Sequence, residues 1–199
     1  MNELNILIAS VGGQGGLTLS RILAEAAVDA GYSVRTGETL GMAQRGGSVQ
    51  SFVRIGKEVR SPLFSQDSAD VLLALEAGEA LRSFGYPKEG ALVLVDPEIK
   101  DTITTITKKE KFPAIDEMLK AMGSWGGRVH VVEARKEASR LGQPRSANVY
   151  MLGVLCSLSS FLPTASIEVA IRNVLGKRGD AAVEVFHAGL KAAAATKLA

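Results

Sequence analysis

The stretch LNILIASVGGQGG, residues 4–16, decides the fold class. The apolar run from Leu4 to Val11 ends at glycines, which is typical of a buried parallel strand. Apolar residues then recur at helical spacing from Leu17 to Ala30, and Gly31 follows where a helix commonly ends. Because Ser33 to Thr36 favours a second strand, the whole segment predicts a strand–helix–strand unit.

The chain departs from a simple repeat after this unit. No helical pattern follows the second strand, and a loop from Glu38 to Gly47 takes its place. Val49 to Ile55 alternates between two faces, and Gly56-Lys57 is typical of a tight turn. We therefore expect a β-hairpin near residues 49–60, with Glu58 to Arg60 as its return strand.

The rest of the chain adds strands first and helices afterwards. Strands are expected at 71–75, 91–95 and 128–132, helices at 78–84 and 114–122, and a weaker strand at 102–107. Three helices follow: 148–162 stopped by Pro163, 167–175 capped by Ser166, and a last one from Ala181 capped by Asp180. The pattern predicts an α/β fold, a Rossmann-like three-layer arrangement with a mixed, mainly parallel sheet and a helical C-terminus packed on it.

Composition narrows the class of protein. The 199 residues carry 23 basic and 21 acidic side chains, which is too balanced to favour nucleic acid as a partner. Cys156 is the single cysteine and His130 and His187 are the two histidines, so we expect no metal site and no cluster site in this chain. We recognise no catalytic nucleophile or acid–base pair, no signal peptide and no membrane segment, and we expect a cytoplasmic protein.

The glycine loop Gly12 to Gly16 precedes a helix, whose N-terminus suits an anion. Gly13 and Gly15 fit two positions of a dinucleotide fingerprint, but Thr18 occupies the third. Glu38 could serve as the ribose ligand, although the helix expected after the second strand is missing. Three interpretations stay open: a tight turn without ligand, a site for a phosphate-bearing ligand, and a surface for a partner.

Two further positions stand near this loop in the expected fold. Arg45, followed by Gly46 and Gly47, offers a bidentate anion donor on an unhindered backbone. Glu76 directly follows a strand, where ligands and partners bind in open α/β sheets, and a charge at a helix N-terminus is an equal alternative.

Three more residues have structural interpretations. Ser146 or Asn148 is expected to cap a helix, and Cys156 is expected to be a small core residue.

Five motifs in one order and spacing carry a family resemblance: Gly12 to Gly16, Gly41 to Val49, Val53 to Gly56, Ser61 to Leu63, and Ala69 to Glu76. Together they resemble the gamma-type subunit of 2-oxoacid:ferredoxin oxidoreductases, most of all the beta subunit of the indolepyruvate enzymes. The resemblance is dense through about Arg82 and returns at Asn148 to Leu155. It implies a single gamma-type domain over residues 1–199.

The resemblance also implies a function. In such enzymes a 2-oxoacid is decarboxylated on thiamine diphosphate, electrons leave through iron–sulfur clusters to ferredoxin, and coenzyme A takes the acyl group. Thiamine diphosphate and the clusters lie on a partner subunit, so this chain would be a non-cluster-bearing subunit, inactive alone, that completes the assembly and contributes to holding coenzyme A. The 2-oxoacid would be indolepyruvate or another aryl pyruvate.

The family's interface or ligand positions carry over onto seven residues: Gly13, Gln14, Gly15, Arg45, Gly46, Gly47 and Glu76. The partners implied are the thiamine- and cluster-bearing subunit and, indirectly, ferredoxin, with no nucleic acid or membrane. Two alternatives remain: a stand-alone NAD(P)-binding enzyme, and a module that senses an acyl-CoA or a nucleotide.

Overall fold

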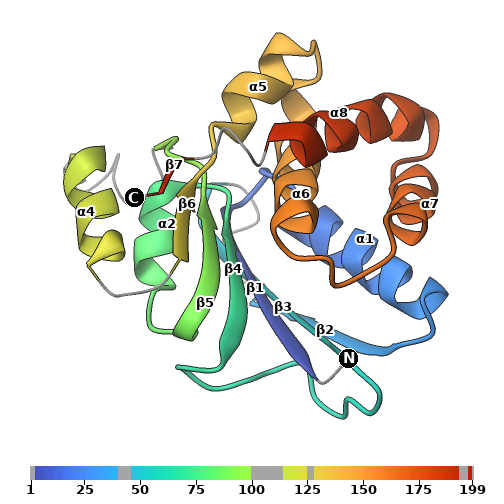
Figure 1. Ribbon diagram of the computed structural model, residues 1–199, viewed down its shortest axis with the longest axis horizontal. Helices are drawn as coiled ribbons and strands as arrows, with labels where there is room; N and C mark the ends of the chain where they lie inside the picture. The colour runs from blue at the N-terminus through green and yellow to red at the C-terminus, as the bar shows by residue number, and fades with distance from the viewer. Residues whose placement is uncertain (1–2, 40–45, 100–113, 125–127, 193–196, 199) are drawn as a thin grey trace.

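The computed structural model describes residues 3–39, 46–99, 114–124, 128–192 and 197–198. Within them, seven strands form one mixed sheet in the order β2-β3-β1-β4-β5-β6-β7 (Figure 1). The strands are β1 (Leu4–Val11), β2 (Ser33–Glu38), β3 (Ser48–Gly56), β4 (Ala69–Ala74), β5 (Pro87–Val95), β6 (Arg128–Val131) and β7 (Lys197–Leu198). Strands β1, β4, β5 and β6 are parallel, whereas β3 is antiparallel to β1 and β2, and β7 is antiparallel to β6.

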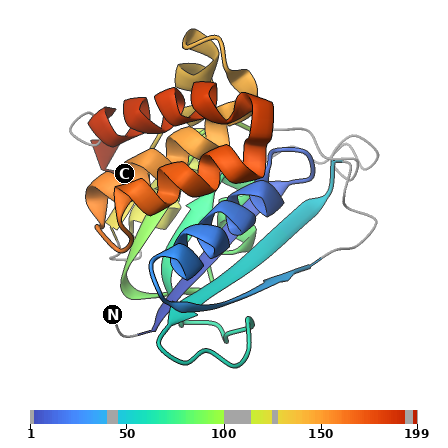
Figure 2. The same cartoon turned by 90° about the vertical axis from the view of Figure 1, so that its right-hand side faces the viewer.

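Helices cover both faces of the sheet. One face carries α1 (Gly16–Asp29), α6 (Ala147–Leu158), α7 (Thr164–Leu175) and α8 (Gly179–Ala192), which lie over one another in Figure 2. The other face carries α2 (Ala77–Arg82) and α4 (Ile115–Gly123). Helix α5 (Ala134–Arg140) stands above the carboxyl ends of the parallel strands (Figure 1).

The middle of each central strand is apolar because both of its faces are buried. In β1, Ile6 and Ile8 belong to the core under α1 and α6, while Leu7 and Ala9 belong to the core under α2 and α4. All four side chains are fully buried. This arrangement is typical of parallel strands between two helical layers, and it confirms the predicted α/β class with a mixed, mainly parallel sheet.

The antiparallel hairpin is present, but its arms differ from the expected ones. Strand β3 pairs with β2 from Ser33 opposite Gly56 to Glu38 opposite Ser51, and on its other side it pairs with β1. The expected return strand from Glu58 to Arg60 is irregular chain instead. With both edges of β3 already paired, no edge is left to receive a third partner.

The C-terminal helices pack on the sheet as expected, with different ends. Helix α6 stops at Leu158, well before Pro163, because Ser159 is extended. Pro163, and not Ser166, is the N-cap of α7, and Ser166 is buried inside that helix. Asp180 lies in the first turn of α8 and does not precede it.

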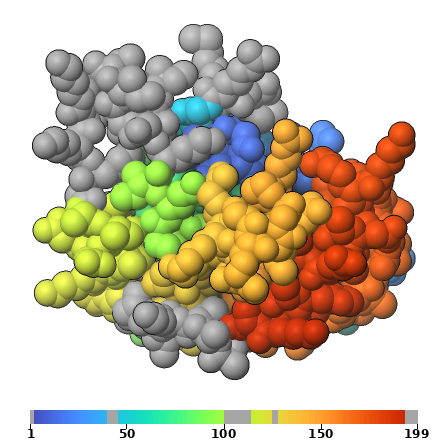
Figure 3. Space-filling model, turned by 90° about the horizontal axis from the view of Figure 1, so that it is seen from above, coloured from blue at the N-terminus to red at the C-terminus, as the bar shows by residue number. Residues whose placement is uncertain are grey.

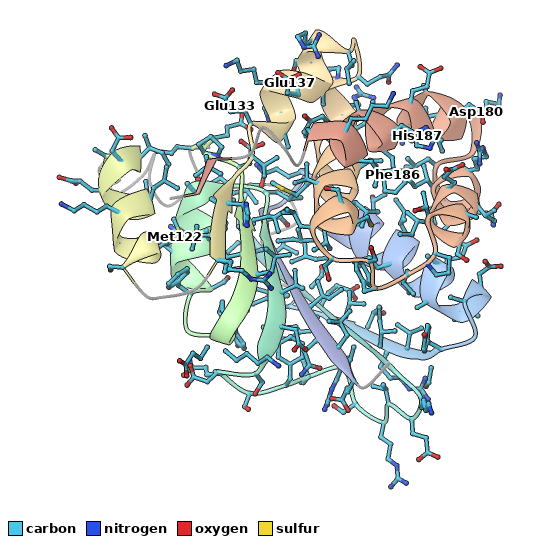
Figure 4. The ribbon with its side chains drawn as sticks, in the orientation of Figure 1. Met122, Glu133, Glu137, Asp180, Phe186 and His187 are labelled. Carbon is cyan, nitrogen blue, oxygen red and sulfur yellow. The ribbon has the colours of Figure 1, made fainter. Side chains whose placement is uncertain are left out.

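Helices α6 and α8 cross in close contact at two glycines. A Cβ atom on Gly153 would lie 2.2 Å from the Phe186 carbonyl oxygen, and one on Gly189 would lie 2.2 Å from that of Tyr150. Phe186 lies beneath α8, close to α6 and α7 (Figure 4). The close crossing explains why α6 is apolar on nearly every side.

Several short elements of the fold differ from the expected ones. The sequence pattern did not predict α5 or the short 3-10 turns η2 (Pro144–Ser146) and η3 (Gly176–Arg178). The expected strand at 102–107 lies outside the described residues. Among the described helices, none combines the length and the apolar character needed to cross a membrane.

Candidate ligand and partner site

The glycine loop between β1 and α1 uses two left-handed residues. Gly13 has φ +97° and Gly15 has φ +89°, a backbone region that other residues rarely adopt. A Cβ atom on Gly15 would lie 2.6 Å from Nδ2 of Asn148, and one on Gly16 would lie 2.5 Å from Oγ of Ser10. Glycine is therefore favoured at Gly15 by both conformation and space, at Gly16 by space, and at Gly13 by conformation alone.

Gln14 ties the loop to the neighbouring strand. Its Oε1 accepts the Val11 N–H at 2.7 Å, and its Nε2 donates to the Leu75 carbonyl at 3.0 Å. Both ends of the side-chain amide are thus engaged with the backbone of β1 and the end of β4. These bonds fix where the loop leaves the sheet edge.

Asn148 holds the loop from the opposite side and does not cap α6. Its Nδ2 donates to the Gly15 carbonyl at 3.0 Å, and its Oδ1 accepts the N–H of Val149, the next residue. Ser146 is the N-cap residue of α6, yet its side chain makes no capping hydrogen bond. Ser146 thus occupies the expected cap position without a side-chain capping bond. The capping interpretation is wrong for Asn148, because the tertiary contact with the Gly15 carbonyl takes its amide.

The two glycine-containing loops meet at one backbone contact. The Gly12 N–H donates to the Gly47 carbonyl at 2.8 Å, and Gly46 is left-handed with φ +82°. Arg45 lies outside the described residues. The predicted proximity of the loops therefore holds for Gly12 and Gly47.

Glu76 is fully buried and caps helix α2. Its Oε2 accepts the Glu79 N–H at 2.7 Å, which confirms the helix N-terminal interpretation of this carboxylate. Glu79 is also fully buried and binds Ser48 Oγ at 2.5 Å and Arg82 Nη1 at 2.5 Å. Ser48 opens β3, so this pair connects the second loop region to α2. Sequence reasoning missed Glu79, because buried carboxylates are rare unless paired.

A pocket of about 270 Å³ opens beside the glycine loop. Its lining comes from the carboxyl ends of three parallel strands and from the N-termini of α1 and α6, including Gly13, Gln14, Gly15, Leu75, Asp96 and Asn148. Figure 3 looks onto this edge, where the blue surface after β1, the green surface after β5 and the orange surface of α5 come together. The pocket thus lies where open α/β sheets bind ligands.

The β5 side of the pocket is acidic and internally bonded. Asp96 is 4% exposed and accepts the N–H groups of Glu98 and Arg135 at 3.1 and 2.9 Å. Burial raises the pKa of Asp96 to about 6, against the lowering effect of these two hydrogen bonds. Glu98 forms an ion pair with the Arg135 guanidinium. Asp96 follows β5 as Glu76 follows β4, so the same sequence signal could have found it.

The helix side of the pocket is basic. Arg145 and Arg178 line the pocket and are exposed, and neither forms an ion pair with any residue in the described part of the chain. They belong to η2 and η3, which sequence analysis did not predict.

The remaining reactive side chains lie elsewhere. Cys156 is buried in the core, and burial raises its pKa to about 12. His187 on α8 contacts Glu168 on α7 at 2.7 Å on the outer surface, near the exposed Asp180 (Figure 4). Among the described residues, no group of three or more His, Cys, Asp or Glu is arranged to hold a metal ion.

The chain is thus an α/β domain with a glycine loop, a second loop bonded to it and a polar pocket at the carboxyl edge of the parallel strands. The family described as pyruvate ferredoxin/flavodoxin oxidoreductase matches residues 5–192. The indolepyruvate oxidoreductase subunit IorB of Thermococcus kodakarensis is 38% identical over 196 residues, which are 97% of each chain. The chain therefore belongs to this family, and the resemblance found in the five motifs is confirmed.

Two solved structures share the fold. The gamma subunit of a keto/oxoacid ferredoxin oxidoreductase from Geobacter sulfurreducens has a TM-score of 0.73 at 23% identity, over 99% of this chain and all of that one. A 2-oxoglutarate:ferredoxin oxidoreductase from Magnetococcus marinus, solved with 2-oxoglutarate, coenzyme A and succinyl-CoA bound, has a TM-score of 0.75 at 22% identity. It matches all of this chain, which covers 32% of that one.

Proposed function

We propose that the chain is the non-cluster-bearing subunit of a 2-oxoacid:ferredoxin oxidoreductase that acts on indolepyruvate or another aryl pyruvate. The observation that carries the proposal is the full-length match to an indolepyruvate oxidoreductase subunit, together with the two bonded glycine loops at the sheet edge. Residues 1–199 then form one gamma-type domain of a cytoplasmic enzyme.

The chemistry belongs to a partner subunit in this proposal. Iron–sulfur clusters need several cysteine thiolates, and the one cysteine of this chain is buried with a pKa of about 12. The proposal therefore places the clusters on the partner, which passes electrons to ferredoxin, and, following the family resemblance, it places thiamine diphosphate there too.

The two loops form the partner surface. The side chains of Gln14 and Glu76 are bonded within the chain, so they act by fixing the backbone at this edge of the sheet. Gly13, Gly15, Gly46 and Gly47 allow close approach of that backbone, and Arg45 supplies a charged contact to the partner.

Coenzyme A is the ligand we propose for the pocket. Two helix N-termini and two exposed arginines match the phosphate groups of the coenzyme, and the Magnetococcus marinus relative was solved with coenzyme A bound. The acyl group would transfer on the partner, close to this edge of the sheet.

The decisive experiment is co-expression with a candidate thiamine- and cluster-bearing subunit. We expect a stable complex with the absorption of iron–sulfur clusters, and reduction of ferredoxin that depends on both the 2-oxoacid and this chain. Absence of a complex, or turnover that is unchanged without this chain, would exclude the proposal.

Arg45→Ala sharpens this experiment. We expect weaker assembly or a higher coenzyme A requirement, while the isolated chain stays folded. Arg35→Ala is the matched control, because Arg35 is exposed on β2 and, among the described residues, its side chain bonds to the adjacent Val34 carbonyl alone. Unfolding of the isolated Arg45→Ala chain would show that Arg45 is structural.

A ligand-sensing module is the second candidate, because this chain contributes a polar pocket at the sheet edge. It predicts binding of an acyl-CoA or a nucleotide without partner-dependent turnover. A stand-alone NAD(P) enzyme has less support, since Glu38 accepts from Ser20 at 3.2 Å and is not among the residues that line the pocket. Titration with NAD(H) and NADP(H) up to millimolar concentrations tests it.

A further inference from the structure

We infer that the free edge of strand β2 and the adjoining flank of helix α1 form a self-association surface. A second copy of this chain pairs with β2 in the antiparallel sense, across a twofold axis that passes through Thr36 perpendicular to the sheet. The two seven-stranded sheets become continuous in the dimer. The inference does not rest on the proposed function.

The outer edge of β2 presents backbone groups to solvent. Strand β2 lies at one end of the strand order, and β3 pairs with its inner side. Just beyond β2, the Thr39 N–H donates to the Gln50 carbonyl of β3 at 2.9 Å. Because residues of an antiparallel ladder alternate between the two sides, three residues of β2 turn their N–H and C=O groups outward: Val34, Thr36 and Glu38.

This edge lacks the usual protection against pairing. Natural proteins commonly block a free edge with proline, lysine or a β-bulge. Strand β2 contains no proline and no lysine, and its register with β3 runs without a shift. The Arg35 guanidinium bonds to the Val34 carbonyl, but this side chain is exposed and free to exchange that bond for a strand partner. The edge is therefore open to another strand.

The charges of β2 select one register for a second copy. With the twofold axis at Thr36, Arg35 opposes Gly37 of the second copy, and Val34 opposes Glu38 of the second copy. The three outward residues then form about six backbone hydrogen bonds across the edge. An axis at Arg35 would place two arginines directly opposite each other, which destabilises a strand pair.

Helix α1 adds an apolar flank beside this edge. Its Ser20 hydroxyl bonds to Glu38 of β2 at 3.2 Å, so this side of the helix lies over the edge strand. Its other side contacts α7, where Asn173 bonds to Glu25 (Figure 2). Val28 is 62% exposed, the largest value among the described large apolar side chains. Three apolar residues that are at least partly exposed follow the helical spacing from Ser20: Leu17, Ala24 and Val28.

The spacing of strands and helices fits a second copy. Helix α1 packs over both β2 and β3. Since neighbouring strands lie about 4.8 Å apart, the two α1 helices of the dimer are about 10 Å apart, which is a normal packing distance. As the crossover between parallel strands, α1 runs antiparallel to β2, and two strand residues correspond to about four helix residues. Thr36 is therefore level with Ala24, whose small side chain permits the close approach of the two helices.

The first test is sedimentation equilibrium of the purified full chain from micromolar to millimolar concentration. We expect a monomer–dimer equilibrium for the wild type. Val28→Glu puts a charge into the apolar contact, and Thr36→Pro removes an outward N–H without a loss to the β3 ladder, so each should weaken dimerisation about tenfold or more. Val169→Glu is the matched control, because Val169 is 46% exposed on α7, on the other side of α1 from β2.

Disulfide trapping tests the register. The Cα atoms of a hydrogen-bonded antiparallel pair lie about 5.5 Å apart, within reach of a disulfide. Thr36→Cys should therefore form a linked dimer on mild oxidation. Arg35→Cys is the control, because in the same register it opposes Gly37 of the second copy. Wild type should stay unlinked, since Cys156 is buried.

Three outcomes overturn the inference. These are a wild type that stays monomeric up to millimolar concentration, a dimer that survives Val28→Glu as well as it survives Val169→Glu, and equal cross-linking of Thr36→Cys and Arg35→Cys. If circular dichroism shows that Thr36→Pro is unfolded, Val28→Glu and the cross-link decide. Because every measurement uses this chain without a catalytic subunit, each of these outcomes leaves the proposed function standing.

Discussion

The segments that follow β1 and β5 begin at the same edge of the sheet, but side chains of different charge fix them. After β1, the amides of Gln14 and Asn148 bond to backbone groups around the glycines. After β5, the Asp96 carboxylate accepts backbone N–H groups of Glu98 and Arg135. In the first segment no acidic group is used, so the α1 N-terminus keeps its positive character. In the second, a buried carboxylate is used, and that wall of the pocket is negative.

The largest expected effect comes from Gly15→Ala. The new Cβ would lie 2.6 Å from Asn148 Nδ2 in a residue with φ +89°, so we expect the free energy of unfolding to fall by about 3 kcal/mol. Urea denaturation measures it. Gly13→Ala is the control: φ is +97° there but no atom lies within 4 Å, so only about 1 kcal/mol is expected. Equal losses would mean that the contact with Asn148 is unimportant.

Asp96 predicts a pH effect on the other segment. Its pKa is about 6 in the folded chain against an ordinary 3.8, so the folded state binds this proton more tightly than the unfolded chain does. The Asp96 contribution to the free energy of unfolding therefore falls as pH rises from 3.8 through about 6. Between these limits, wild type should lose about 2 kcal/mol relative to Asp96→Asn. Parallel stability curves in urea denaturation from pH 4 to pH 8 would contradict the raised pKa.

Asn148→Ala tests the remote bond to the glycine loop. Asn148 is 3% exposed, and its loss leaves the Gly15 carbonyl without this donor, so we expect a cost of about 1.5 kcal/mol. Asn148→Asp is an informative companion, since it retains the acceptor for Val149 but lacks the donor to Gly15. Full stability of both variants would show that the bond is dispensable.

The smallest expected effect is the coupling between these two positions. In the double variant Gly15→Ala/Asn148→Ala, the side chain that the new Cβ would meet is absent. The loss should therefore be smaller than the sum of the two single losses by about 1 kcal/mol. Strict additivity in the same denaturation assay would place the strain of Gly15→Ala in the backbone alone.

Local sequence patterns predicted the elements whose signal lies within the segment itself. The first strand was predicted at Leu4 to Val11, as found, because its apolar run and the following glycines carry the signal within the segment. The end of α6 was predicted less well, because that helix is buried on nearly every side and lacks a clear amphipathic face. The hairpin was expected near residues 49–60 with a return strand after the turn at Gly56-Lys57, but β3 pairs with β1 and β2.

The residues of the candidate site also differ in how far the sequence could reveal them. The glycines and Gln14 were recognisable because they lie next to each other in a strand–loop–helix pattern, and the family resemblance depended on similar short motifs. Asn148 was misinterpreted as a cap, because its contact with Gly15 spans 133 residues. Ser146, Arg145 and Arg178 line one pocket only because η2 and η3 lie beside the glycine loop in the folded chain.

The sequence by itself therefore determined the α/β class, the strand–glycine loop–helix unit and the family, since each depends on residues close together in the chain. Tertiary structure alone decided which strand completes the hairpin, how Asn148 and Gln14 fix the loop, and which charges face the pocket. The physical reason is that hydrogen bonds and electrostatic fields act over a few ångströms in space, whatever the separation along the chain. The glycine loop was visible from its residues, but the pocket beside it required the folded chain.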